Sequence, residues 1–344
     1  MDDRDRQDPV QWAADAGRDL YGVATWDERT RLDRVARSVH VGLITSGRVL
    51  VVLVALLIIL GQLALMGAAL VRDPLIGGYI VASVIPALLI AFFVWRSDVT
   101  VAQPLRPLVV TFLLGVIFAS FAAVANSSLQ DSFRALGPLG VVLFFYVVVA
   151  PVEESVKLLA VRMYGYRQER FASVVDGAVY GAVAGLGFAT IENAIYITQQ
   201  YLQTATAVGA QSPLLRTLPT AAVRTFAGPG HVIYSAIAGY YLGLAKFNPD
   251  DRGPIVVKGL LIAAFIHGTY NVLVSNIGVA LEVLSPLVVV PQSLGFVAFV
   301  LVFDAAMLLG LIVKLRRYAR AFRETGAAAY FARHPEADVD DAME

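Results

Sequence analysis

The stretch PLGVVLFFYVVVAPVEESVKLLAVR occupies residues 138–162 and decides the fold class of this chain. It is long enough to cross a bilayer as a helix, which requires about 20 predominantly apolar residues. It also contains Glu153, Glu154 and Lys157. A charged side chain in the hydrocarbon region costs about 2.5–3.5 kcal/mol unless it faces a partner or a polar cavity. The stretch therefore predicts a transmembrane helix that lines a polar site.

The composition of the whole chain is that of a membrane protein with several spans. Its 344 residues are 58% hydrophobic and 16% charged, with a mean hydropathy of +0.68, whereas a soluble domain has about 25% charged residues. The chain has no cysteine, which excludes disulfides, thiolate metal ligands and a cysteine nucleophile. Its net charge of zero gives nucleic-acid binding no electrostatic support. The composition predicts an integral membrane protein that does not bind nucleic acid.

Apolar runs along the chain predict an all-α, polytopic protein with about eight transmembrane helices. The expected spans are residues 49–71, 75–95, 108–126, 138–162, 174–198, 219–245, 254–276 and 290–313. Residues 277–289 are apolar but short, and we expect them to be interfacial or re-entrant. The simplest organisation is a cytoplasmic N-terminal region over 1–47, one transmembrane domain over 48–316 and a cytoplasmic tail over 317–344.

Positively charged residues predict the orientation of these spans. Arginines and lysines flank the first and last spans, and the connections on the same side carry most of the others. By the positive-inside rule both termini are cytoplasmic, in the plasma membrane, which agrees with an even number of spans. Within residues 1–47, Leu32, Val35 and Val39 recur at helical spacing and predict an amphipathic helix at the membrane surface. A solvated tail with one amphipathic turn is the alternative.

The fourth span carries two adjacent carboxylates and a lysine. Glu153 lies four residues and Glu154 three residues before Lys157, so the lysine can pair with either. Adjacent side chains point about 100° apart on a helix, so we expect one carboxylate to face a wet cavity and the other to pair with Lys157. A buried ion-pair network of all three is the alternative, and Asp176 is a further candidate partner of Lys157. Pro151 removes a backbone hydrogen bond and is expected to kink the helix one turn earlier.

The fifth span predicts both close packing and a second carboxylate. Gly177, Gly181 and Gly185 recur at four-residue spacing, which is typical of a helix face that a neighbouring helix approaches closely. Glu192 follows nearer the outer surface, and we expect it to pair with Arg224 of the sixth span, which lies at a similar depth. The depth of Glu192 fits a single site only if this span begins later or if water enters from the outer side.

The sixth and seventh spans each carry a histidine near the middle of the membrane, at the depth of Glu153. The sequence Gly-Pro-Gly over residues 228–230 is expected to break the helix just before His231. In the seventh span, His267 and Asn271 are four residues apart and share one helical face. Two histidines at the depth of a glutamate pair indicate a site rather than isolated interhelical contacts.

These side chains predict hydrolysis inside the membrane. Water held between a carboxylate base and donors to an oxyanion forms a hydrolytic site. Glu153 or Glu154 would take the proton from water, and His267 with Asn271 would stabilise the tetrahedral oxyanion. No serine lies in a recognisable nucleophile setting, so direct attack by water is the simpler route.

A metal-dependent site is the alternative arrangement of the same residues. His231, His267 and Glu192 supply the three protein ligands that a catalytic zinc ion takes. Their spacing matches no short zinc motif, so the sequence leaves zinc and metal-free chemistry both open.

Four short motifs lie in order on four consecutive predicted spans. They are EExxK at Glu153, Glu154 and Lys157; FxxxE followed by Asn at Phe188, Glu192 and Asn193; His231 after the Gly-Pro-Gly sequence; and HxxxN at His267 and Asn271. Together they resemble the PrsW family of intramembrane proteases, which is distantly similar to the CAAX prenyl protease and bacteriocin-processing group. The resemblance covers about residues 138–276, the expected catalytic core of the transmembrane domain.

The resemblance implies a protease that cuts a membrane-anchored protein substrate near or within the bilayer. In PrsW-like proteins the suggested role is site-one cleavage of an anti-sigma factor. The implied catalytic residues are Glu153, Glu154, Glu192, His231, His267 and Asn271, with Lys157, Asn193, Asp176 and Arg224 as structural support. The resemblance leaves open whether zinc or a metal-free glutamate–water pair performs the reaction. CAAX relatives usually have histidine where this chain has Glu192, which argues against prenylated substrates.

Two other functions use the same polar core. Carboxylates and histidines also form the relays of proton-coupled transporters, but here they gather in one half of the chain and no two-fold repeat is apparent. A non-catalytic scaffold or binding protein of the same fold is the other possibility. Substrate cleavage separates a protease from a scaffold, and flux into sealed vesicles tests for transport.

Overall fold

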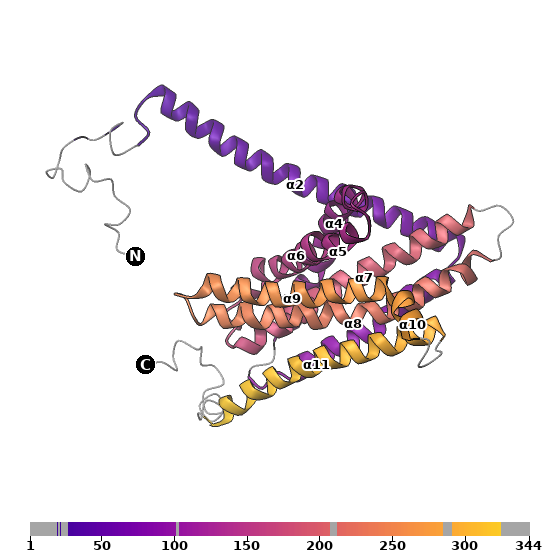
Figure 1. The fold of residues 1–344 in the computed structure, drawn as a ribbon. Helices are drawn as coiled ribbons and strands as arrows, with labels where there is room; N and C mark the ends of the chain where they lie inside the picture. The colour runs from indigo at the N-terminus through magenta and orange to yellow at the C-terminus, as the bar shows by residue number, and fades with distance from the viewer. Residues whose placement is uncertain are drawn as a thin grey trace. The chain divides into compact units, whose positions relative to one another are not determined.

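The structure, a computed structural model, is helical in the part of the chain that it describes. The described residues are 27–100, 103–206, 212–284 and 291–324, with Asp19 and Tyr21. They contain no β-strand (Figure 1), which confirms the predicted all-α class. Of the predicted cytoplasmic tail, residues 325–344 lie outside these residues. The chain divides into two compact units, Met1–Leu57 and Ile58–Glu344.

The first unit contains the first half of helix α2, Arg31–Arg72. The start of this helix is stabilised by Asp33, whose Oδ2 accepts the backbone N–H of Thr30 at 2.7 Å. Leu32 and Val35 lie exposed on its surface. Residues 31–47 are therefore helical, as the beginning of a helix that continues through the first predicted span, and an amphipathic helix at the membrane surface stays a prediction.

The second unit continues α2 and contains the remaining helices. They are α3 Leu75–Arg96, α4 Leu105–Arg134, α5 Gly137–Phe144, η2 Phe145–Val149, α6 Ala150–Met163, η3 Gly165–Arg167, α7 Val174–Ala205, α8 Pro213–Lys246, α9 Arg252–Ser275, α10 Ile277–Leu284 and α11 Gln292–Glu324. The short α10 occupies the stretch predicted to be interfacial or re-entrant. Several helices extend past the predicted spans because polar turns continue them beyond the apolar run.

Six of the described helices are long and apolar enough to cross a membrane, which makes this a polytopic membrane protein. They are Leu75–Arg96, Leu105–Arg134, Gly137–Arg167, Val174–Ala205, Arg252–Ser275 and Gln292–Glu324. The first predicted span contains a shorter apolar helix, Leu56–Arg72. The sixth predicted span lies in α8, which is 34 residues long but carries Arg216, Arg224 and His231. The total of eight spans therefore stays a prediction.

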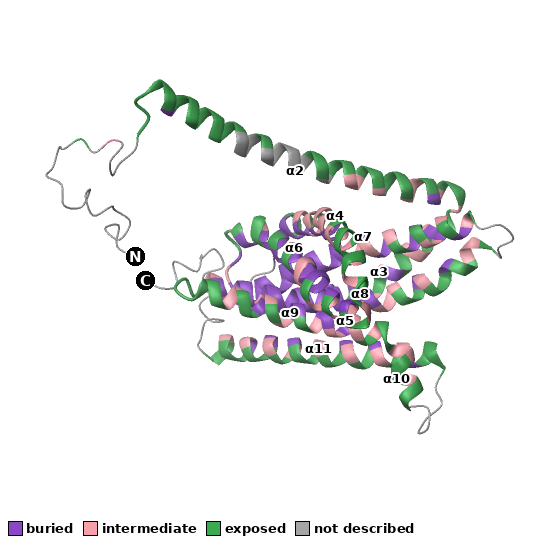
Figure 2. Ribbon diagram, turned by 45° about the horizontal axis from the view of Figure 1, so that its top comes forward, coloured by how far each residue is buried: buried purple, intermediate pink, exposed green. Residues whose placement is uncertain are grey.

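Helices α7 and α8 form the centre of the second unit (Figure 2). In α7, 89% of the apolar span is buried inside the protein, against 17% in α11. The predicted glycine row of α7 faces α8. A Cβ atom on Gly177, Gly181 or Gly185 would lie 2.2 Å, 2.2 Å or 2.4 Å from a backbone oxygen of α8. The row therefore permits the backbone contact that its spacing predicts.

A second pair of glycines brings α4 equally close to the other side of α7. A Cβ atom on Gly187 of α7 would lie 2.2 Å from the carbonyl oxygen of Phe112, and one on Gly115 of α4 would lie 2.4 Å from that of Ala184. Helices α3, α9 and α11 contact α8 (Figure 1). These contacts bury most of α7 and the part of α8 from Ala227 onward, which explains how α8 tolerates the polar residue His231.

The fourth predicted span is interrupted where Pro151 predicts a kink. Its backbone forms the π-helical turn Phe145–Val149 between α5 and α6. Pro151 has no N–H to donate to the preceding turn, and a π-turn is a common way to absorb that loss near a functional site. The turn precedes Glu153 and Glu154 by one to two helical turns and sets the direction in which α6 presents them.

The predicted break at residues 228–230 is wrong, because α8 continues as one helix from Pro213 to Lys246. The two glycines serve close packing instead. A Cβ atom on Gly228 would lie 3.3 Å from Ala87 of α3, and one on Gly230 would lie 2.7 Å from the hydroxyl of Tyr234. Packing against the surrounding helices keeps α8 helical on both sides of Pro229.

The glycine row should be intolerant of even one added methyl group. Gly181→Ala places a Cβ atom 2.2 Å from the carbonyl oxygen of Ser235, so the helices must separate. We expect it to lower the free energy of unfolding by about 1–3 kcal/mol, measured by thermal unfolding in detergent. Gly310→Ala in α11 is the control, because its Cβ would meet nothing within 4 Å. Equal stability of the two variants would contradict the close contact.

Candidate active site

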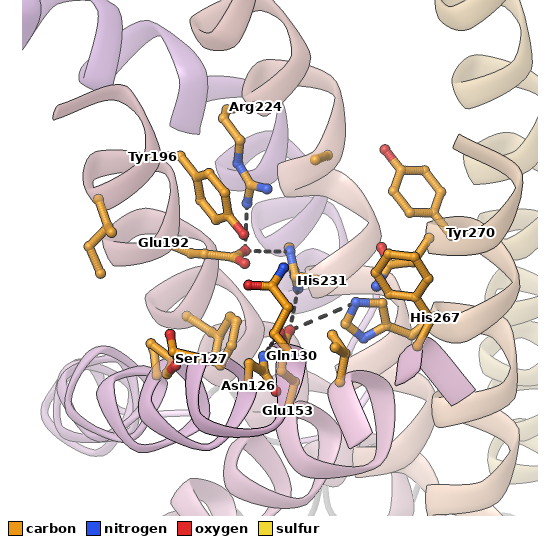
Figure 3. Close-up of a pocket in the computed structure, with 18 of the residues that line it drawn as sticks. Asn126, Ser127, Gln130, Glu153, Glu192, Tyr196, Arg224, His231, His267 and Tyr270 are labelled. Carbon is orange, nitrogen blue, oxygen red and sulfur yellow. Dashed lines mark hydrogen bonds and ion pairs between the residues drawn. The ribbon is translucent and has the colours of Figure 1, made fainter. Parts of the chain in front are cut away.

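The candidate active site is a pocket of about 460 Å³ among α4, α6 with the π-turn, α7, α8 and α9. Figure 3 shows its polar side chains converging from these helices. Five of the six predicted catalytic residues line it, namely Glu153, Glu192, His231, His267 and Asn271. The sixth, Glu154, is fully buried and bonded to His267 of that lining.

Lys157 is buried at the centre of the cluster. Its Nζ lies 2.7 Å from Glu154 Oε1 and 3.8 Å from Glu153 Oε2. It also donates to His231 Nδ1 at 2.9 Å and lies 4.2 Å from the centre of the Phe188 ring. The structure combines features of both predicted arrangements, because Lys157 pairs closely with Glu154 and at longer range with Glu153, and Glu153 also lines the pocket.

Each histidine is held by a carboxylate on one ring nitrogen. His231 Nε2 lies 2.9 Å from Glu192 Oε2, and His267 Nδ1 lies 2.9 Å from Glu154 Oε1. Because a carboxylate accepts hydrogen bonds, we assign the imidazole proton to these two nitrogens. The remaining nitrogens, Nδ1 of His231 and Nε2 of His267, then present lone pairs to the middle of the cluster.

Glu153 faces both of these lone pairs. Its Oε1 accepts from Asn126 Nδ2 at 3.0 Å, whereas its Oε2 is buried without a hydrogen-bond partner among the described residues. That Oε2 lies 3.8 Å from His267 Nε2 and 4.0 Å from His231 Nδ1. A buried polar atom without a partner is costly, so this oxygen marks the position of a water, an ion or a reacting group.

A metal ion fits the donor atoms at this point. Glu153, His231 and His267 each offer one ligand atom, and these atoms lie within 4.8 Å of one another. Two histidines and a glutamate are a common donor set for catalytic zinc, and a carboxylate on the far nitrogen of each histidine is the usual second support. The set differs from the predicted one, because Glu153 takes the place of Glu192. Lys157 also contacts His231 Nδ1, so this nitrogen has two competing partners.

Glu192 connects the cluster to a second positive charge. Arg224 lies 2.5 Å from Glu192 Oε2, which is the predicted pair, and its Nε donates to Asn193 Oδ1 at 2.8 Å. Asn193 in turn donates to the carbonyl oxygen of Ser83 in α3 at 3.2 Å. This chain of contacts orients the carboxylate that holds His231.

The structure bears on the depth of Glu192 in two ways. Helix α7 runs from Val174 to Ala205, past the predicted end of the span at residue 198, so a later start of the span stays possible. The pocket also extends past Glu192 to Gln130, Tyr196 and Gln199, near the ends of α4 and α7. Figure 3 shows Tyr196 beside Arg224 and Glu192, and Gln130 in front of the cluster near His231 and Glu153.

Asp176 is not a partner of Lys157, so that prediction is wrong. Its Oδ2 accepts the backbone N–H groups of Ala172 and Ser173 at 2.8 Å and 2.7 Å, and the Ser173 hydroxyl accepts from the backbone of Asp176. This reciprocal pair is a capping box at the start of α7. Depth along the membrane normal suggested the pairing, but it carries no information on the lateral position.

Several polar residues of the site were not predicted. Asn126, Tyr234 and Tyr270 line the pocket, and the two tyrosine hydroxyls are buried without a hydrogen-bond partner among the described residues. Asp304 of α11 is buried near both tyrosines. Asp304 could have been found from the sequence, because it is a carboxylate in an apolar span. Asn126, at the end of a predicted span, and Tyr234 and Tyr270, in apolar runs, have no such signal.

Known proteins of one family are similar to this chain. The profile described as PrsW family intramembrane metalloprotease matches residues 103–306, more than half of the chain. Protease PrsW of Clostridioides difficile (strain 630) is 29% identical over 192 residues, which cover 55% of this chain and 76% of that protein. Protease PrsW of Oceanobacillus iheyensis is 25% identical over 244 residues, covering 71% and 96%. Protease PrsW of Bacillus subtilis (strain 168) is 25% identical over 193 residues, covering 55% and 79%.

No solved structure matches this chain. The apolar helices and the matches together define an integral membrane enzyme, an intramembrane protease that acts on a protein substrate in the bilayer. The chain belongs to the PrsW family.

Lys157 should be essential for stability because it neutralises buried carboxylates. Lys157→Met leaves Glu154 fully buried without a cation, and we expect a loss of about 3–5 kcal/mol in the free energy of unfolding. The double variant Lys157→Met/Glu154→Gln removes both charges and should recover part of that loss. Thermal unfolding of the single and double variants measures the difference. A double variant less stable than Lys157→Met would show that the pair is not the source of the loss.

Proposed function

We propose that this protease hydrolyses a peptide bond of its substrate by direct attack of water that Glu153 activates. The observation that supports this is the Glu153 Oε2 atom, which has no hydrogen-bond partner among the described residues and lies 3.8 Å from His267 Nε2 and 4.0 Å from His231 Nδ1. Water held there lies within reach of a carboxylate base and of two histidines.

In the proposed reaction Glu153 takes a proton from water as the water oxygen bonds to the carbonyl carbon. Negative charge then develops on the carbonyl oxygen, and the amide of Asn271 is the available donor in the pocket. The carbon–nitrogen bond breaks as the proton passes from Glu153 to the leaving amine. Glu154 and Glu192 act as positioning residues, because each holds one histidine in a single orientation.

The same residues accommodate the metal-dependent form of this chemistry. Glu153, His231 and His267 would hold the ion. A bound zinc ion would supply a water of lowered pKa and polarise the scissile carbonyl. Lys157 would then have to share or release His231 Nδ1, which it contacts at 2.9 Å. In both forms Glu153 and the two histidines surround the reacting water.

The resemblance to PrsW-like proteins suggests the biological setting. We propose site-one cleavage of an anti-sigma-factor-like protein in the plasma membrane, with both termini of the protease in the cytoplasm. The clustering of positive charges near the ends of the transmembrane domain supports that orientation. The extension of the pocket to Gln130 and Gln199 supports water entry from the opposite, outer side.

Removing the carboxylate charge of Glu153 should abolish cleavage without unfolding the protein. Glu153→Gln keeps the shape of the side chain and its contact with Asn126, but removes the base, so we expect a loss of at least about 10²–10⁴-fold in rate. His267→Ala should lose activity to a similar degree. Cleavage of a panel of single-span membrane proteins by purified protein measures both, and thermal unfolding confirms the fold. Normal activity in both variants would refute the site.

Removal of metal distinguishes the two forms of the mechanism. If a metal is required, a chelator should abolish cleavage and zinc should restore it, and His231→Ala should lower the zinc content of the purified protein. Zinc content is measured by elemental analysis and needs no active enzyme. Full activity in metal-free protein would exclude the metal-dependent form and leave the Glu153–water form.

A further inference from the structure

A second cavity adjoins the active-site pocket on the side of α2. It has a volume of about 310 Å³ and lies among α2, α4 and α7. Four residues line both this groove and the active-site pocket, namely Ala123, Ser127, Ile195 and Gln199. The groove therefore adjoins the pocket that contains Glu153, and these four residues form the wall between them.

The floor of the groove contains a polar group with no role in the fold. Thr198 of α7 is 3% exposed, and its hydroxyl has no hydrogen-bond partner among the described residues. Thr190 and Thr204 of the same helix instead donate to the carbonyl four residues earlier, at 2.7 Å and 2.9 Å. The Thr198 hydroxyl is thus available to a molecule that occupies the groove.

The rim of the groove is apolar and faces outward from the helices. Leu65 of α2 and Val124 of α4 are 54% and 46% exposed. In an integral membrane protein, exposed apolar side chains on membrane-spanning segments contact lipid. About one turn earlier on both helices, Gln62 of α2 accepts from the Ser120 hydroxyl of α4 at 3.0 Å. The groove therefore lies between the lipid-facing surface and the wall of the active-site pocket.

We infer that this groove admits the transmembrane segment of the substrate, in a locally extended form, from the bilayer to Glu153. The inference rests on the proposed function. An unwound peptide in hydrocarbon needs partners for its N–H and C=O groups. Thr198, Ser127 and Gln199 offer such partners along the route to the pocket.

Photo-crosslinking tests the occupant directly. Because the chain has no cysteine, Leu65→Cys and Val124→Cys each introduce a single thiol at the rim for a benzophenone maleimide. Leu261→Cys in α9, where the native side chain is 64% exposed, is the matched control. All three are made in the Glu153→Gln background, so binding is scored without cleavage. The probe is the pooled panel of single-span membrane proteins used to measure cleavage.

We expect the benzophenone adducts at Leu65→Cys and Val124→Cys to crosslink the same panel members that the active protease cleaves. The adduct at Leu261→Cys should crosslink none of them. Equal crosslinking at all three positions, or none at the rim, would overturn the inference. Rim crosslinks in the absence of any cleavage by the active protease would support the groove and refute the proposed function.

A rate measurement separates the groove from the catalytic step. In the active protein, the adduct on Leu65→Cys should slow cleavage of a single-span protein at least tenfold. It should leave cleavage of a short water-soluble peptide of the same cut site unchanged, because that peptide need not cross the rim. Thr198→Val should raise KM for the single-span protein by about two- to tenfold, the effect of one lost hydrogen bond. Equal slowing of both substrates by the adduct would overturn the inference.

Discussion

The structure depends on the neutralisation of buried charge around Lys157. Its ammonium group lies between Glu154 and His231, and these two residues connect it to His267 and Glu192. An unpaired charge in such an interior would cost several kcal/mol, so each member fixes the position of the next. The network ends at Arg224, beyond Glu192. Glu153 joins it at longer range and retains one free carboxylate oxygen, which is why we place the chemistry there.

The packing of the helices and the chemistry of the site are tied together at one point. A Cβ atom on Gly185 of α7 would lie 2.4 Å from the carbonyl oxygen of His231, so this glycine determines how close the histidine lies to α7. One and two turns further along α7, Phe188 and Glu192 contact the ring of the same histidine. The glycine row is therefore part of what positions His231, in addition to stabilising the bundle.

Much of this was predictable because the bilayer restricts what a sequence can do. Apolar runs predicted the helices, and ionisable residues within them predicted the cluster, including the pair of Glu192 with Arg224. The wrong predictions concern the position of a side chain around the helix axis, which its depth in the membrane does not determine. Asp176 lies at a suitable depth for Lys157 but caps α7. The group that could hold a metal contains Glu153 in place of Glu192, because the rotation of each helix about its axis decides which carboxylate faces both histidines.

Local propensity failed where tertiary packing was stronger. Gly-Pro-Gly predicts a break in an isolated helix, but contacts with α3 and α7 keep α8 continuous. The groove beside α2 had no sequence signal, because its polar residues are ordinary threonine, serine and glutamine side chains in helices. Two features of the structure mark the groove as a candidate binding site. It shares a wall with the active-site pocket, and the Thr198 hydroxyl has no hydrogen-bond partner among the described residues.

The central claim is that Glu153 and the histidines act on one water as a single unit. The most direct test compares the cleavage rates of Glu153→Gln, His267→Ala and the double variant under single-turnover conditions. Residues that act as a unit are strongly non-additive, so the double variant should be no slower than the slower single variant. Losses that multiply in the double variant would show two independent contributions and contradict the account.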